Sequence, residues 1–168
     1  AKWDTEKYVK EYNFLLNNDK SNVNWYILRY ADVLLMYAEA LNEWHHGPNN
    51  AALAALNMVR RRGYGLPYNE ANTTVDLKST SYEGFQEYIR NERAYELAFE
   101  GNRRQDLIRW GMYYETIVNT YIKLIGWYPE ANYVAYQYTQ KNKHELLPIP
   151  ARDMSLMENF KQNQGWGD

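Results

Sequence analysis

Cysteine is absent from this chain of 168 residues. Without thiols the chain forms no disulfide bond, holds no thiolate-bound metal and has no cysteine nucleophile. The absence does not identify a compartment, because exported bacterial proteins also commonly lack disulfides. Localisation therefore has to be inferred from other features.

A surplus of positive charge is also missing. The 19 Lys and Arg residues stand against 21 Asp and Glu residues, for a formal net charge of -2. Such a balance gives no field suited to a phosphate backbone, so nucleic acid is not an expected partner. No run approaches the roughly 18 continuous apolar residues of a membrane-spanning helix, and residues 1–4 resemble neither a signal peptide nor a natural start. We expect a soluble fragment or a processed product.

Aromatic rings with a polar group are abundant. The chain has 17 Tyr and 6 Trp against 4 Phe, and 45% of its residues are hydrophobic, enough for one globular core or a large piece of one. Tyr and Trp suit half-wet surfaces and bind sugars by stacking and hydrogen bonding, but tyrosine-rich helix packing gives the same composition. Burial statistics favour packing.

Hydrophobic periodicity predicts a first helix over residues 25–43. Its expected apolar face is formed by residues at helical spacing, namely Tyr26, Tyr30, Val33, Tyr37 and Leu41. Arg29, Asp32 and Glu43 are expected toward the other side. A glycine and a proline at positions 47 and 48 end this helix, and Asn49 or Asn50 caps a second helix that stops near residue 63. The two helices form an antiparallel hairpin.

A loop without periodicity is predicted over residues 64–79, followed by a third helix that starts at a capping-box sequence (residues 80–83) and reaches about Glu100. A fourth helical stretch runs from about residue 104 to 125, with Gly111 as a candidate kink or break. These two make a second hairpin, unlike the first. Beyond residue 125 we expect long loops or short strands. The predicted fold class is mainly α, with irregular tetratricopeptide-like helical hairpins and long loops.

Two carboxylates stand out on the third helix. At 100° per residue, Glu92 and Glu96 lie in the middle of an apolar face. The other members of that face are Phe85, Tyr88, Ile89, Tyr95 and Phe99. Acid pairs serve glycoside hydrolysis, but these two point the same way from one helix. A di-iron site needs His three residues after each Glu, where this chain has Tyr95 and Phe99. We predict no catalytic residue, no metal site and no cofactor.

Buried carboxylates need arginine partners, because an unpaired charge away from water is strongly destabilising. Arginine offers a planar fork that holds a carboxylate with two hydrogen bonds. The third-helix acids have several candidates near the helix ends. We predict a structural ion-pair network made of Arg29, Arg60, Glu92, Glu96 and Arg103.

Several stretches together resemble the C-terminal signature of SusD/RagB proteins. They are residues 29–40 (RYADVLLMYAEA), 57–62 (NMVRRR), above all 92–111 (ERAYELAFEGNRRQDLIRWG), and near the end 147–150 (LPIP) and 162–166 (QNQGW). The tail departs from the family pattern, because Arg152 and Asp153 stand where glutamate is usual, and Gln164 and Trp166 replace proline and tyrosine. By this resemblance, residues 1–168 are a C-terminal region within a larger single binding domain.

The resemblance implies a cell-surface lipoprotein on the outer membrane of a Gram-negative, Bacteroidetes-like bacterium. Such a protein binds glycan or peptide nutrients, as in polysaccharide utilisation, and catalyses nothing. It also implies a SusC-like TonB-dependent transporter as partner, and membrane attachment only through an N-terminal lipid absent from this chain. Two alternatives stay open, a helical-repeat scaffold that binds protein partners and, less favoured, a secreted glycoside hydrolase.

Rings in segments without periodicity are the candidates for ligand contact within this chain. Trp127 and Tyr128 stand between a glycine and a proline, and Tyr64 and Tyr68 stand in the predicted loop after the second helix. No periodic face buries such rings. Stacking on a sugar or a peptide side chain explains them, and so does packing beneath a loop or against another part of the protein, which burial statistics favour.

Overall fold

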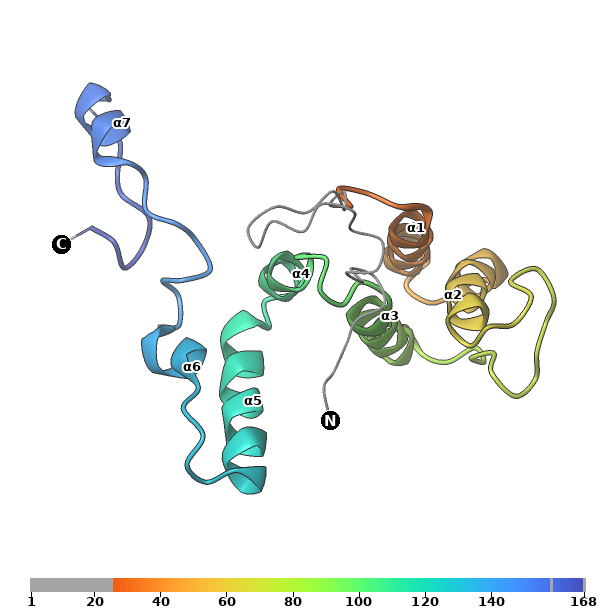
Figure 1. Cartoon of the computed structure of the whole chain (residues 1–168). Coiled ribbons are helices and arrows are strands. Elements are labelled where there is room, and N and C mark those ends of the chain that lie inside the picture. The colour runs from red at the N-terminus through yellow and green to blue at the C-terminus, as the bar shows by residue number, and fades with distance from the viewer. Residues whose placement is uncertain (1–25, 158, 168) are drawn as a thin grey trace, which may run out of the picture. The chain divides into compact units, whose positions relative to one another are not determined.

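The structure is a computed structural model that describes residues 26–157 and 159–167. Over these residues the chain forms helices and no strand (Figure 1). The helices are α1 (Tyr30–His45), α2 (Asn50–Gly63), α3 (Tyr82–Glu96), α4 (Arg103–Arg109), α5 (Tyr113–Trp127), α6 (Val134–Tyr138) and α7 (Ala151–Leu156). The predicted mainly α class, with irregular tetratricopeptide-like hairpins and long loops, is confirmed. The chain divides into two compact units, one that ends at Gly101 and one that begins at Asn102.

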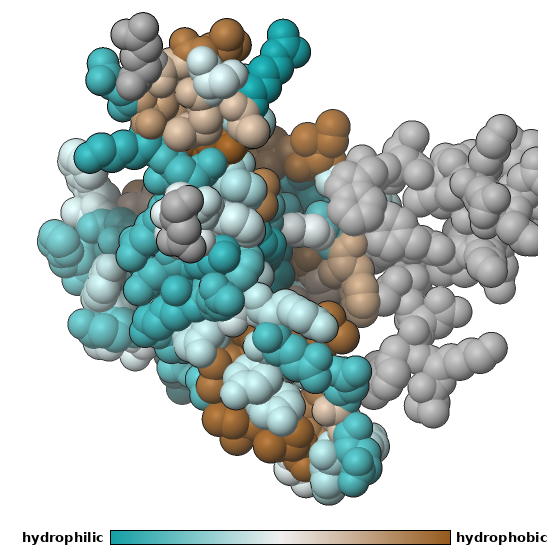
Figure 2. Space-filling view, turned by 90° about the vertical axis from the view of Figure 1, so that its left-hand side faces the viewer, coloured by the Kyte–Doolittle hydropathy of each residue, from teal (hydrophilic) through white to brown (hydrophobic). Residues whose placement is uncertain are grey.

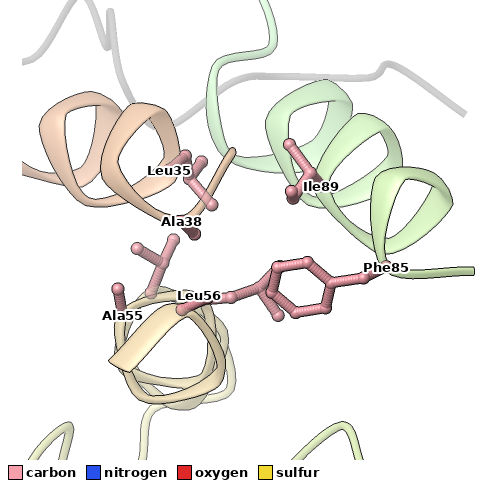
Figure 3. Close-up of a cluster of buried hydrophobic side chains, with 8 residues drawn as sticks. Leu35, Ala38, Ala55, Leu56, Phe85 and Ile89 are labelled. Carbon is pink, nitrogen blue, oxygen red and sulfur yellow. The ribbon is translucent and has the colours of Figure 1, made fainter. Parts of the chain in front are cut away.

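The first unit is built on α1, α2 and α3, which lie side by side (Figure 1). A short connection joins α1 to α2 in a helical hairpin, and α3 packs against both. Side chains from all three helices point toward one another in the core (Figure 3). The cluster consists of Leu35, Ala38, Ala52, Ala55, Leu56, Val59, Phe85 and Ile89. Its alanines let the helix backbones approach closely around the larger side chains.

Side-chain caps fix where α2 and α3 begin. The Asn49 side chain accepts a hydrogen bond from the Ala52 amide at 2.8 Å, so the cap predicted at Asn49 or Asn50 is Asn49. The α3 cap is Ser81, whose hydroxyl accepts from the Gly84 amide at 3.1 Å. The cap is therefore the second residue of the predicted capping box (residues 80–83), and not the first.

The predicted apolar face of α1 is wrong except at Leu41, which packs against the core, and the helix starts at Tyr30 and not near residue 25. Tyr30, Val33 and Tyr37 are exposed. The buried residues of α1 are instead Asp32, Leu35, Ala38, Glu39 and Asn42. Polar residues face inward because α3 supplies partners for them: Arg93 pairs with Asp32, and the Tyr82 carbonyl accepts from Asn42.

The third helix ends at Glu96 rather than near residue 100. Beyond it, Phe99 takes a positive φ of 65°, uncommon for a residue other than glycine, and the helical face stops. Phe99, predicted to be buried beside the carboxylates, is therefore 68% exposed, and Tyr95, which still belongs to α3, is 71% exposed as well.

The second unit begins with α4 and α5. Gly111, with a φ of 67°, separates these helices, so the predicted break at this residue is confirmed. The rings of Tyr121 and Tyr136 stack in parallel, with centroids 4.0 Å apart, and join α5 to α6. Helices α6 and α7 lie where we expected loops or strands, because five and six residues are too few for a periodic signal. None of the described helices is both long and apolar enough to cross a membrane.

Polar side chains hold the last described segment to an earlier extended stretch. The Gln162 side chain donates to the Ile149 carbonyl at 2.8 Å and accepts from its amide at 2.7 Å. Asn163 donates to the Leu147 carbonyl at 2.7 Å, and the Trp166 indole donates to the Lys143 carbonyl at 3.1 Å. The tail is thereby anchored without a β-sheet.

Neighbouring residues on α1 test the core. Leu35 is fully buried and Met36 is 42% exposed. We expect Leu35→Ala to lower the free energy of unfolding by about 2–5 kcal/mol, because it leaves a cavity among three helices. We expect Met36→Ala to cost less than about 1 kcal/mol. Urea unfolding of both variants measures the difference, and equal losses would show that the core lies elsewhere.

Candidate functional site

The two carboxylates of α3 are buried and ion-paired. Glu92 lies 3.1 Å from the Arg60 guanidinium at the end of α2. Glu96 contacts Arg29 at 2.5 Å and also pairs with Arg62. Arginines from outside α3 therefore hold both acids on its inner face, which connects α3 to α2 and to the start of α1.

Arg29, the residue before α1, makes the most extensive contacts. Its Nε and Nη2 atoms donate to the two Glu100 oxygens, each at 2.8 Å, and Nη2 also donates to the Glu96 carbonyl at 2.7 Å. Burial by itself lowers the pKa of Arg29, but hydrogen bonds to Glu100 and Glu96 outweigh it and raise the pKa above its ordinary value. Glu100 was absent from the predicted network, although its place four residues after Glu96 was a usable signal.

Two further ion pairs were also missed. Arg93 on α3 contacts Asp32 on α1 at 2.7 Å, with both side chains buried. Arg61 holds Asp76 through two hydrogen bonds of 2.6 Å and donates to the Tyr68 carbonyl at 3.0 Å, which fixes the loop after α2. The hydrogen bond from Arg61 lowers the pKa of Asp76.

Arg103, the remaining member of the predicted network, begins α4 in the second unit. Its guanidinium lies 5.8 Å from the centroid of the Trp110 ring. That distance fits a cation–π contact. Its membership in the network with Glu92 and Glu96 stays a prediction.

An open pocket of about 650 Å³ lies over the carboxylate face of α3 in the first unit, and we call it the α3 pocket. Glu92 and Glu96 line it together with Arg60 and with rings from two elements. The rings are Tyr64, Tyr88 and Tyr95. Burial raises the pKa of Glu92, while the hydrogen bond from Arg60 acts in the opposite direction. The pocket combines aromatic faces with hydrogen-bond acceptors and a cation.

The four rings predicted to contact ligand lie in three places. Tyr64 lines the α3 pocket, and Tyr68 lines a separate pocket of about 410 Å³ that also includes Arg29 and Arg62. Trp127 and Tyr128 belong to the second unit. Trp127 was expected in a loop but is the last residue of α5, because the helix continues through Gly126.

Trp127 and Tyr128 are 76% and 66% exposed. Figure 2 shows that apolar residues, in brown, reach the surface between hydrophilic ones, in teal. Within the described part of the second unit these two rings are therefore largely uncovered.

The described arrangement favours binding. Glu92 and Glu96 project from one helix, and arginine occupies each of them, so they do not flank a substrate as a hydrolase requires. The described residues also contain no group of three His, Cys, Asp or Glu side chains suited to a metal ion. What they offer to a ligand is aromatic surface and hydrogen bonding.

A family model described as the SusD family matches residues 2–166. The chain belongs to the SusD family. SusD-like protein P25 of Formosa agariphila is 36% identical over 147 residues, which are 85% of this chain and 25% of that protein. SusD-like protein P2 of the same organism is 30% identical over 162 residues, which are 94% of this chain and 29% of that protein.

Solved structures of SusD proteins have the same fold. A SusD homolog from Bacteroides thetaiotaomicron is 55% identical with a TM-score of 0.79, over 90% of this chain and 29% of that one. A SusD superfamily protein from Parabacteroides distasonis is 26% identical with a TM-score of 0.57, over 89% of this chain and 29% of that one. The chain thus spans less than a third of the length of these SusD relatives, and it matches their C-terminal portion.

The buried pair of this SusD chain provides a stability test. Asp32→Asn removes the charged partner of Arg93 between α1 and α3. We expect a loss of about 3–5 kcal/mol in the free energy of unfolding. The control is Glu115→Gln, which breaks an exposed pair with Lys141 and should leave the unfolding midpoint unchanged. A near-zero effect of Asp32→Asn in urea unfolding would contradict the structural role of this pair.

Asp76 gives a prediction for pH dependence. Its folded pKa lies below its unfolded value of about 3.9, so its contribution to stability is present above that pH and is lost as pH falls through the folded pKa. We expect Asp76→Asn to lower stability at pH 7 and to flatten the acid side of the stability profile. Denaturant unfolding at a series of pH values between 2 and 7 measures this. Parallel profiles for both proteins would refute it.

Proposed function

We propose that the protein carrying this chain binds glycan or peptide nutrients at the bacterial cell surface and passes them to a SusC-like TonB-dependent transporter. The observation that carries the proposal is the family match along nearly the whole chain, from residue 2 to residue 166. Residues 1–168 then serve as the C-terminal region of a larger binding domain. An N-terminal lipid outside this chain anchors that protein to the outer membrane.

The chemistry of α3 supports a role without catalysis. General acid–base hydrolysis of a glycoside requires two carboxyl groups on opposite sides of the scissile bond. Here Glu92 and Glu96 are neighbours on one helix, and Arg29, Arg60 and Arg62 occupy them. The charges hold helices together, and the two acids are not placed to act as acid and base on opposite sides of a substrate.

Within this chain, Trp127 and Tyr128 are the proposed ligand contacts of the second unit, and Tyr64 and Tyr68 those of the first. All four rings are exposed. Large exposed rings supply contact area at a low cost in conformational entropy, and their faces stack on sugars or on peptide side chains.

Single substitutions in the full-length protein test the proposal. We expect Trp127→Ala and Tyr128→Ala each to weaken oligosaccharide or peptide binding by about tenfold, the equivalent of 1.4 kcal/mol, with unchanged melting temperature. The matched control is Trp44→Ala, an equally exposed ring on α1 in the first unit. Calorimetry and thermal unfolding give the two readouts, and chromatography of the ligand after incubation should show no product.

Two results would contradict the proposal. Product release that Glu92→Gln abolishes in a folded variant would mean hydrolysis. A lower melting temperature with unchanged affinity in the Trp127 and Tyr128 variants would assign these rings to packing.

A further inference from the structure

One complete face of α3 lines the α3 pocket. The lining residues on this helix are Tyr88, Asn91, Glu92, Tyr95 and Glu96. Their spacing of three, four, seven and eight residues from Tyr88 is that of a single helical face. Tyr88 and Tyr95 are two turns apart, about 10 Å along the helix axis at 1.5 Å per residue. Tyr64, at the C-terminal end of α2, lines the same pocket.

The fold accounts for Tyr88 but not for Tyr95. Tyr88 packs on the core and meets the Phe85 ring edge-on, with centroids 6.5 Å apart. Tyr95 is exposed and forms no hydrogen bond with another described residue. A large ring held on a rigid helix, with its face uncovered beside polar groups, is a typical anchor for a ligand.

Polar capacity remains beside these rings. Arg60 donates to Oε2 of Glu92, and no described residue donates to its other oxygen. Burial raises the pKa of Glu92, so a further donor would stabilise the ionised carboxylate. Asn91, with an exposed amide, lies one residue away and supplies both a donor and an acceptor.

The charges around the pocket decide which ligands fit. The charged residues that line the pocket are Arg60, Glu92 and Glu96, and each acid is paired, Glu92 with Arg60 and Glu96 with Arg29 and Arg62. Because these charges already have partners, the described lining residues offer no unpaired charge to attract an ionic ligand. Uncovered rings with nearby donors and acceptors suit a neutral ring that carries many hydroxyl groups.

We propose that the α3 pocket is a saccharide contact site for neutral glycans, separate from the rings at the end of α5. Tyr95 and Tyr64 stack on a pyranose ring, and Glu92 and Asn91 hydrogen-bond its hydroxyl groups. The inference rests on the proposed function, because it assumes that the protein binds nutrients, and it adds the place and the ligand class.

Calorimetric titration of the full-length protein tests the site. The ligands are four neutral hexasaccharides (maltohexaose, cellohexaose, xylohexaose and mannohexaose), one anionic (hexagalacturonate) and one cationic (chitosan hexamer). We expect at least one neutral hexasaccharide to bind, and Tyr95→Ala to weaken it tenfold or more with unchanged melting. Tyr95→Phe keeps the ring, so we expect its dissociation constant to stay within about threefold of that of the parent protein. A tenfold change corresponds to about 1.4 kcal/mol.

The matched control is Tyr37→Ala, which removes an exposed tyrosine of α1 that does not line the pocket and should leave affinity unchanged. Tyr64→Ala is a second pocket variant, with a loss of affinity expected in the same direction.

Three results would each overturn the inference: preference for a charged hexasaccharide, absence of binding to any neutral hexasaccharide, or unchanged affinity in both pocket variants. If Trp127→Ala weakens binding while the pocket variants do not, the proposed function stands and this inference alone fails. If no glycan or peptide binds at all, the proposed function fails as well.

Discussion

The first unit depends on one guanidinium. Arg29 reaches from the start of α1 to the end of α3, across 67 and 71 positions of sequence, and uses three nitrogen atoms on Glu96 and Glu100. Losing Arg29 would cost more than the pairs themselves contribute, because Glu96 and Glu100 are buried and would stay buried without the guanidinium. Together with the Arg93–Asp32 pair, the contact fixes which end of α3 meets the start of α1.

A core organised by charge also changes the surface. The inner faces of α1 and α3 carry acids, amides and arginines that pair with one another. Many of the aromatic rings that would be expected in the core therefore point outward. Tyr30 and Tyr37 on α1 and Tyr95 on α3 are examples. The exposure of these rings is thus a consequence of how the ion pairs fill the interior.

The sequence predicted those features that depend on residues close together in the chain. The extent of α2, its Asn49 cap, the break at Gly111 and the need of the α3 acids for arginine all follow from neighbouring residues. The inner face of α1 could not be found this way, because periodicity does not reveal that Asp32 has Arg93 as a partner 61 positions away. The grouping of Tyr64 with Tyr95 in one pocket depends on the same long-range packing.

The anchored tail affects how this chain meets others. In the extended stretch of residues 147–150, the Gln162 amide occupies both backbone groups of Ile149, as a neighbouring strand would, and Asn163 takes the Leu147 carbonyl. The prolines at positions 148 and 150 have no N–H to offer. An edge occupied in this way is closed to strand addition, which protects an apolar and otherwise adhesive segment from pairing with a second polypeptide.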